Sequence, residues 1–249
     1  MYNLQIENQS DSLIFHYLDI NEIDEEFQNL IISSITEICG GRYTQYSLDF
    51  FKRRLYNFLN GKNDEGKKGA IAEFIIHIHL NYLSFSQEFL FLNLEERSVK
   101  KGFDGYYLLN GEHWIVESKS SGIVNEKHES KILEAYNDLK SKLETKIPNN
   151  PWNNAYNHMR HQDVNTNQSI VSVIRQYSEE FENEIFQDIK KFNVIPCSTL
   201  YLGNDWNPIN KEDLEIKLQT LCQRFGYRKM IIICINSKSF QDFINLILV

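Results

Sequence analysis

The sequence has few of the residues that define several common protein classes. Its four cysteines (Cys39, Cys197, Cys222 and Cys234) lie far apart and form no Cys-x-x-Cys pair, which argues against a zinc site or a disulfide framework. No stretch approaches the roughly 18 apolar residues of a membrane-spanning helix. The start, "MYNLQIENQSDS", lacks the basic and apolar regions of a signal peptide. We therefore expect a protein of the reducing cytoplasm with no membrane partner.

Basic residues are also scarce. The chain has 26 Lys and Arg against 34 Asp and Glu, a formal net charge of −8. This balance argues against a protein that binds nucleic acid unaided, because such proteins normally carry a basic excess. The charge is uneven, however, since "FKRR" (51–54), "GKKG" (66–69) and "VKKG" (99–102) are basic. These patches are either solvated faces or local phosphate contacts.

The remaining composition is that of a globular protein with a sizeable core. The 249 residues are 42% hydrophobic and 13% aromatic, which suits one large domain or one domain with an extension. Apolar residues recur at helical spacing over 22–39 and 47–59, and a polar loop follows at 60–69. Further helices are expected at about 69–83, 126–146, 170–192, 210–225 and 239–248, and strands at about 88–94, 102–120, 198–203 and 228–236.

Strands that alternate with helices predict an α/β architecture. We interpret residues 61–150 as the core of the protein. Residues 1–60 form an N-terminal extension with helices and a strand, and residues 151–249 form a C-terminal α/β extension. The second extension either completes the sheet of the core or docks a partner.

The segment "GFDGYYLLNGEHWIVESKS" (102–120) predicts a β-hairpin. Asn110-Gly111 is the strongest short signal for a two-residue type I′ turn. With this pair as the turn, the numbers of cross-strand partners sum to 221, so Asp104 faces Glu117. Alternation along the strand then places Lys119 on the same face as Glu117. The hairpin therefore brings two carboxylates and a lysine together.

Two like charges directly opposite each other destabilise a hairpin, and a divalent cation can compensate for them. Mg²⁺ prefers oxygen ligands and is commonly held by one or two carboxylates, with waters and substrate phosphates. Lys119 beside the pair can hold or deprotonate a water, or contact a phosphate oxygen. Glu73, the only acid in the apolar helix "GAIAEFIIHIHL", can approach the same metal from the side.

An acid on a helix, then Asp, then Glu-x-Lys after an apolar strand resembles the PD-(D/E)xK nuclease superfamily. This resemblance implies a core with a mixed central sheet flanked by helices, as in restriction endonucleases. It also implies that Glu73, Asp104, Glu117 and the backbone carbonyl of Ser118 hold Mg²⁺ or Mn²⁺. Lys119 would position or activate the attacking water. The implied activity is metal-dependent cleavage of phosphodiester bonds in DNA.

Two positions depart from the superfamily pattern. Phe103 replaces the usual proline before Asp104, and a Gln-x₃-Tyr element is not matched, because Ile132 stands at the Gln position before Tyr136. The motifs "GAIAEF", "KKGFDGYY", "IVESKS" and "EAYNDLK" resemble the HamA family, the nuclease subunit of Hachiman antiphage defence. This resemblance spans roughly residues 60–145. It implies a heterodimer with a helicase subunit, HamB, that restrains and directs the nuclease on DNA.

Other interpretations remain open. The acids and Lys119 could line a solvated hairpin face. The enzyme could be a stand-alone restriction-type endonuclease. The nuclease fold could also be catalytically inert and serve as a DNA-binding or interaction subunit. The pairs His77/His79 and His158/His161 offer metal-binding residue types, but their ligands do not visibly converge on one zinc ion, so core or surface histidines are favoured.

Overall fold

The computed structural model of this chain describes residues 3–88, 90–91, 102–161 and 168–248. The strands within these residues are β1 (Asn3–Ser10), β2 (Leu13–Ile20), β3 (Ser86–Gln87), β4 (Gly105–Leu109), β5 (Glu112–Ser121), β6 (Asn193–Tyr201) and β7 (Lys229–Ser237). They form one sheet in the order β1-β2-β7-β6-β5-β4-β3. Strands β2, β7, β6 and β5 are parallel, whereas β1, β4 and β3 pair antiparallel with their neighbours.

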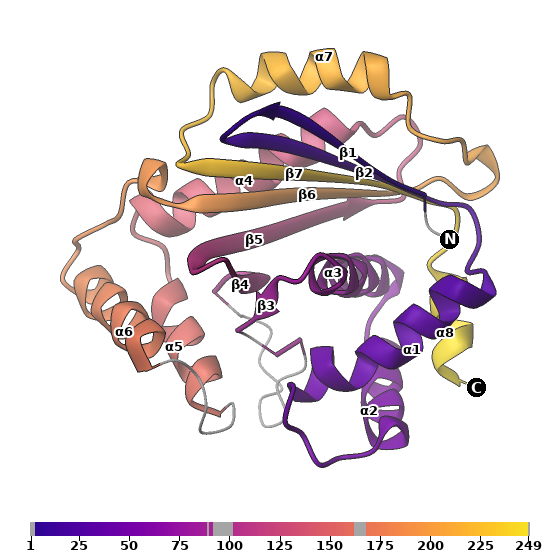
Figure 1. Ribbon diagram of the computed structural model, residues 1–249, viewed down its shortest axis with the longest axis horizontal. Coiled ribbons are helices and arrows are strands. Elements are labelled where there is room, and N and C mark those ends of the chain that lie inside the picture. Colours follow the sequence, from indigo (N-terminus) through magenta and orange to yellow (C-terminus); the bar gives the residue numbers. More distant parts are fainter. Residues whose placement is uncertain (1–2, 89, 92–101, 162–167, 249) are drawn as a thin grey trace.

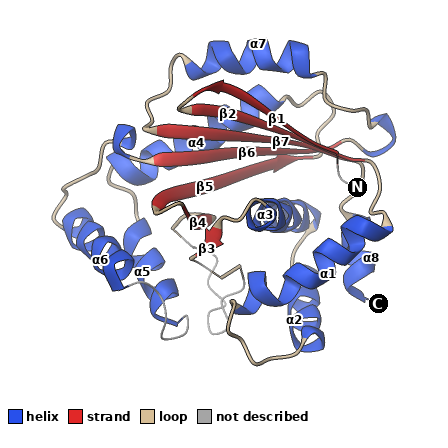
Figure 2. Cartoon of the chain, in the orientation of Figure 1, coloured by secondary structure: helices blue, strands red, loops and turns tan. Residues whose placement is uncertain are grey.

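Helices cover both faces of this sheet (Figures 1 and 2). One face carries α1 (Glu25–Gly40), α2 (Leu48–Asn60), α3 (Asp64–Tyr82) and α8 (Gln241–Leu248). The other carries α4 (His128–Glu144), α5 (Pro151–His161), α6 (Gln168–Glu182) and α7 (Lys211–Cys222). Two short 3₁₀ helices, η1 (Ile189–Lys191) and η2 (Gly203–Asp205), flank β6. The predicted α/β class, with a mixed sheet flanked by helices, is confirmed.

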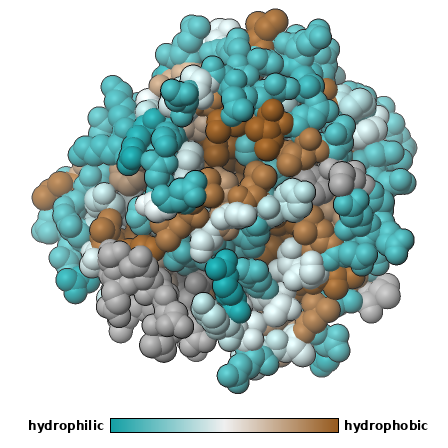
Figure 3. Space-filling view, in the orientation of Figure 1, coloured by the Kyte–Doolittle hydropathy of each residue, from teal (hydrophilic) through white to brown (hydrophobic). Residues whose placement is uncertain are grey.

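Each face of the sheet has its own apolar core. Strand β7 shows the division, because Ile231, Ile233 and Ile235 pack on the α1–α3 side, whereas Ile232 and Cys234 pack on the α4 side. A central parallel strand buried on both faces needs such a continuous apolar run. In the view of Figure 3 the surface is mainly hydrophilic, with hydrophobic residues gathered near its middle. None of the helices in the described residues is long and apolar enough to span a bilayer.

All three segments distinguished in the sequence supply strands to the sheet. From residues 1–60, β2 pairs with β7, and from residues 151–249, β6 pairs with β5 of the 61–150 segment. Strand β5 therefore has β6 on one side and β4 on the other. In this arrangement Glu117 is buried and Asp104 is half-buried.

The structure differs from the local expectations at three places. In the strand expected at 88–94, residues 88, 90 and 91 are not in a strand, and the two-residue β3 lies just before them; residues 89 and 92–101, which include most of "VKKG", lie outside the described residues. Helix α5 was not predicted; it begins at Pro151, because proline fits the first turn of a helix. Strand β6 begins at Asn193, five residues early. It contains Pro196, and neither Ile195 nor Pro196 has a partner in β7, although the β6–β7 register is the same on both sides of them.

Candidate active site

The turn between β4 and β5 sets the geometry of the site. Asn110 and Gly111 both have positive φ, 52° and 78°, as a type I′ turn requires. The register follows, with Gly105 opposite Val116. Asp104 directly precedes β4, and its N–H donates to the carbonyl of Val116 (3.1 Å). Asp104 therefore lies opposite Glu117, as the turn predicted.

The carboxylate of Asp104 bends back onto β5. Its Oδ2 accepts a hydrogen bond from the N–H of Ser118 at 2.8 Å. Since the N–H and C=O of one strand residue point to the same side of the strand, the carbonyl of Ser118 also points toward Asp104. Strand β4 begins at Gly105, whereas β5 continues to Ser121, so this carbonyl lies beyond the paired part of the hairpin.

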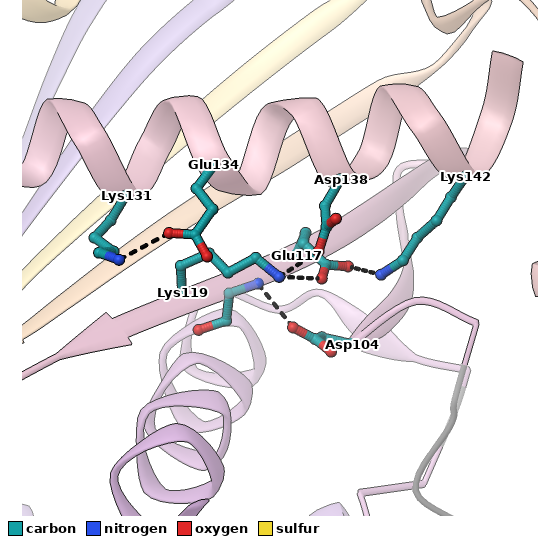
Figure 4. A network of polar contacts seen from close by, with 8 residues as sticks. Asp104, Glu117, Lys119, Lys131, Glu134, Asp138 and Lys142 are labelled. Atoms are coloured by element: carbon teal, nitrogen blue, oxygen red, sulfur yellow. Dashed lines mark hydrogen bonds and ion pairs between the residues drawn. The ribbon is translucent and has the colours of Figure 1, made fainter. Parts of the chain in front are cut away.

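Glu117 and Lys119 point toward α4. Ile115 packs in the core on the α4 side and Val116 in the core on the α3 side. Because side chains alternate along a strand, Glu117 and Lys119 share the face of Ile115. Figure 4 shows both beneath α4, with Asp138 and Lys142 pointing toward them.

Two residues of α4 complete an ion-pair network around Glu117. Lys142 Nζ lies 2.5 Å from Glu117 Oε2, and Lys119 Nζ lies 3.0 Å from Glu117 Oε1. Lys119 also contacts the carboxylate of Asp138. The Glu117 side chain is only 3% exposed, so both of its oxygens are paired with ammonium groups in a nearly dry environment.

Sequence reasoning assigned no role to Asp138 or Lys142. The available signal was their spacing of four residues, which places them on the same face of a helix. Lys131 and Glu134 belong to the same face and pair with each other at 2.8 Å (Figure 4). What the spacing did not reveal is that this charged face lies over β5 rather than in solvent.

Helix α4 is anchored to the sheet at its start. The buried His128 forms hydrogen bonds with Ser198 Oγ (2.8 Å) and Asn236 Oδ1 (2.9 Å), on β6 and β7. Burial lowers the pKa of His128 to about 4, so the ring is neutral at pH 7. Ile132 and Tyr136, the two positions compared with a Gln-x₃-Tyr element, are buried in the core beneath this helix. Both side chains therefore contribute to packing.

Glu73 reaches the site from α3, on the other side of the sheet. Its Oε1 lies 3.7 Å from His77 Nε2, and His77 Nδ1 contacts the hydroxyl of Tyr107. Glu73 is also close enough to Asp104 to raise the pKa of that carboxyl. The second histidine of the pair, His79, is buried and bonds to another histidine. The side chains of His158 and His161 lie outside the described part of the chain.

Two acids of the site, Glu117 and Asp104, are difficult to ionise in the metal-free protein, whereas the pKa of Asp138 is lowered, because the charged Lys119 outweighs the effect of burial. Burial, followed by repulsion from Asp104, raises the pKa of Glu117 to about 8, although Lys142 and Lys119 oppose the shift. Burial and then Glu73 raise the pKa of Asp104. Burial favours the neutral form of Lys119, but Glu117 and Asp138 outweigh it and raise its pKa. Lys119 therefore keeps its positive charge at neutral pH.

The charges of the site suit a divalent cation. Four carboxylates and two ammonium groups meet here: Glu73, Asp104, Glu117, Asp138, Lys119 and Lys142. Fully ionised, they sum to −2. Among the described residues, no three His, Cys, Asp or Glu side chains form a ready-made metal cluster. Asp104, Glu117 and the Ser118 carbonyl instead offer the partial oxygen shell typical of Mg²⁺, which leaves other positions to water and phosphate.

Comparison with known proteins identifies one family. The family model described as HamA matches residues 3–248, nearly the whole chain and far beyond the motifs around the hairpin. A search of curated proteins found no significant match. The matched range includes every residue of the site and both flanking segments.

Proposed function

Because this chain belongs to the HamA family, we propose that it is a metal-dependent DNA nuclease, the effector of Hachiman antiphage defence in the cytoplasm. Family membership supports the role in defence. The observation that carries the proposed chemistry is the pair of the half-buried Asp104 and the buried Glu117 beside Lys119 on one hairpin. Burial and a neighbouring acid raise the pKa of Glu117 to about 8 although two lysines contact it, and a divalent cation would favour its ionised form.

In this proposal Asp104, Glu117 and the Ser118 carbonyl hold Mg²⁺ or Mn²⁺, and Glu73 supports them from α3. When bound, the cation polarises a phosphate oxygen and lowers the pKa of a coordinated water. Lys119 stays charged because Glu117 and Asp138 raise its pKa, so it suits holding the attacking water and stabilising negative charge. It is less suited to removing a proton. Asp138 fixes the ammonium group in place.

Incubation with supercoiled, nicked and linear DNA tests this function. We expect cleavage with Mg²⁺ or Mn²⁺ and none with EDTA, because the buried acids cannot activate water without the cation. Discrete fragments formed by the chain alone would instead identify a stand-alone restriction-type endonuclease. No cleavage of any DNA, with every cation and with a partner present, would identify an inert nuclease fold.

We also propose that a helicase subunit delivers the nuclease to DNA as part of a heterodimer. This proposal rests on family membership and on the net charge of −8, since Lys and Arg that neutralise phosphates dominate affinity for duplex DNA. Co-expression with a HamB-type helicase should give a complex that co-elutes in gel filtration and binds duplex more tightly than the nuclease alone. Equal DNA affinity and equal cleavage with and without the helicase would contradict this part.

A further inference from the structure

Both oxygens of the Glu117 carboxylate are paired with lysines. Oε1 faces Lys119 at 3.0 Å and Oε2 faces Lys142 at 2.5 Å, and the two lysine side chains are themselves only 21% and 19% exposed. A divalent cation that binds Glu117 must therefore compete with at least one ammonium group. Repulsion between the cation and that group adds to the competition, because nearby charges interact strongly where water is scarce.

The two lysines are not held equally. Lys119 has a second carboxylate partner, Asp138, which ties it to α4 (Figure 4). Among the described residues, Lys142 forms one ion pair within 4 Å, with Glu117, and interacts with Asp104 and Asp138 from farther away. It also stands in the last turn of α4, two residues before the helix ends at Glu144. Lys142 is thus the lysine that can leave Glu117 with the smaller loss of contacts.

A displaced ammonium group in this setting needs a new acceptor. Leaving it beside a cation and away from any anion would be costly, since a poorly hydrated charge requires a partner. The substrate supplies one, because DNA brings phosphate oxygens to the same edge of β5. A lysine on a flexible four-carbon stem is well suited to follow such a phosphate.

Resting on the proposed nuclease function, we propose that Lys142 is an exchangeable counter-ion. It contacts Glu117 before a divalent cation binds, and it contacts a DNA phosphate after the cation has taken Glu117. Lys142 is then a substrate-contacting residue from α4, in addition to the residues of the hairpin.

Calorimetric titration of Mn²⁺ without DNA tests the first half. Lys142→Met should tighten Mn²⁺ binding by about tenfold, because one competing positive charge is removed from a nearly dry site. Lys142→Arg should leave the affinity close to that of the wild type. The matched control is Lys140→Met on the same helix, whose exposed side chain pairs with Glu144 at 3.6 Å and should change nothing.

Circular dichroism checks that the variants are folded. If Lys142→Met does not fold, Lys142→Gln keeps a hydrogen-bond donor for Glu117 and should also tighten Mn²⁺ binding. Unchanged or weaker Mn²⁺ binding in a folded, uncharged variant would overturn the counter-ion role.

Fluorescence anisotropy with a short duplex tests the second half, using Ca²⁺ as the hard cation and EDTA as the cation-free condition. In Ca²⁺, Lys142→Met should weaken binding and reduce the salt slope by about one, the value for one lost phosphate contact. In EDTA it should have no effect, because Lys142 then remains on Glu117. If Lys142→Met weakens DNA binding equally in Ca²⁺ and in EDTA, the exchange is wrong. The control Lys140→Met should show no difference between the two conditions.

The two levels of the proposal fail separately. If the wild type cleaves DNA but Lys142→Met leaves Mn²⁺ affinity unchanged, the nuclease function stands and the exchange is wrong. If Lys142→Met tightens Mn²⁺ binding but the wild type cleaves no DNA, the counter-ion role stands and the nuclease function is wrong.

Discussion

Asp104→Ala and Glu117→Ala are each expected to slow Mg²⁺-dependent DNA cleavage by about a thousandfold or more. A catalytic metal contributes several kcal/mol of charge stabilisation to the transition state, and each step of about 1.4 kcal/mol corresponds to a factor of ten in rate. Each variant loses one of the two side chains proposed to bind the cation together with the Ser118 carbonyl. Single-turnover cleavage at saturating enzyme measures the effect directly.

The matched control is Glu112→Ala. Glu112 lies on the same strand as Glu117, at the other end, where it pairs with Arg228 and Lys229. Its removal should leave the cleavage rate within about twofold of the wild type, because surface ion pairs contribute little. If the Asp104 and Glu117 variants cleave DNA at the wild-type rate, this hairpin does not hold the catalytic metal.

The two variants should differ in their effect on folding. Glu117→Ala leaves Lys119 and Lys142 without their shared, buried acceptor, so we expect a lower melting temperature in EDTA. Asp104→Ala removes a group that repels both Glu73 and Glu117, and loses one hydrogen bond to Ser118. Its melting temperature in EDTA should therefore fall less than that of Glu117→Ala. Glu117→Gln keeps the shape of the side chain and provides a folded alternative for the kinetic measurement.

Lys119→Met should slow cleavage by about 10²- to 10³-fold, the range for losing one donor that stabilises charge in the transition state. Its distinguishing feature is that Mn²⁺ should still bind, because Lys119 is not a metal ligand. Titration with Mn²⁺ alongside single-turnover cleavage separates a loss of chemistry from a loss of metal.

Lys131→Met serves as the control for Lys119. Lys131 lies on the same charged face of α4 but pairs with Glu134 and Glu126, away from Glu117. It should retain most of the cleavage rate. If Lys119→Met cleaves DNA as fast as the control, Lys119 serves only as a structural partner of Glu117 and Asp138.

The hairpin could be predicted from the sequence because its information is local. An Asn-Gly pair fixes the turn, the turn fixes the register, and the register places Asp104 opposite Glu117. The apolar run of β7 was equally readable, since a strand buried on both faces has no polar alternation.

The contacts between distant elements were not predictable in this way. In the sequence, Asp138 and Lys142 are typical of a solvent-exposed helix face. The hydrogen bonds of His128 dock α4 on the sheet and so place that face over β5. The strand predicted at 198–203 lacks the first five residues of β6, which include Pro196, a residue that is rare in a central strand and here has no partner in β7. Both errors concern partners far apart in the sequence.

The most direct measurement of the central claim is anomalous diffraction from crystals grown with Mn²⁺. We expect one strong peak in contact with the carboxylates of Asp104 and Glu117 and with the Ser118 carbonyl, and a Lys142 side chain that has moved away from Glu117. An Mn²⁺-saturated crystal with no peak at these atoms, and with Lys142 still on Glu117, would contradict a metal-dependent nuclease site in this protein.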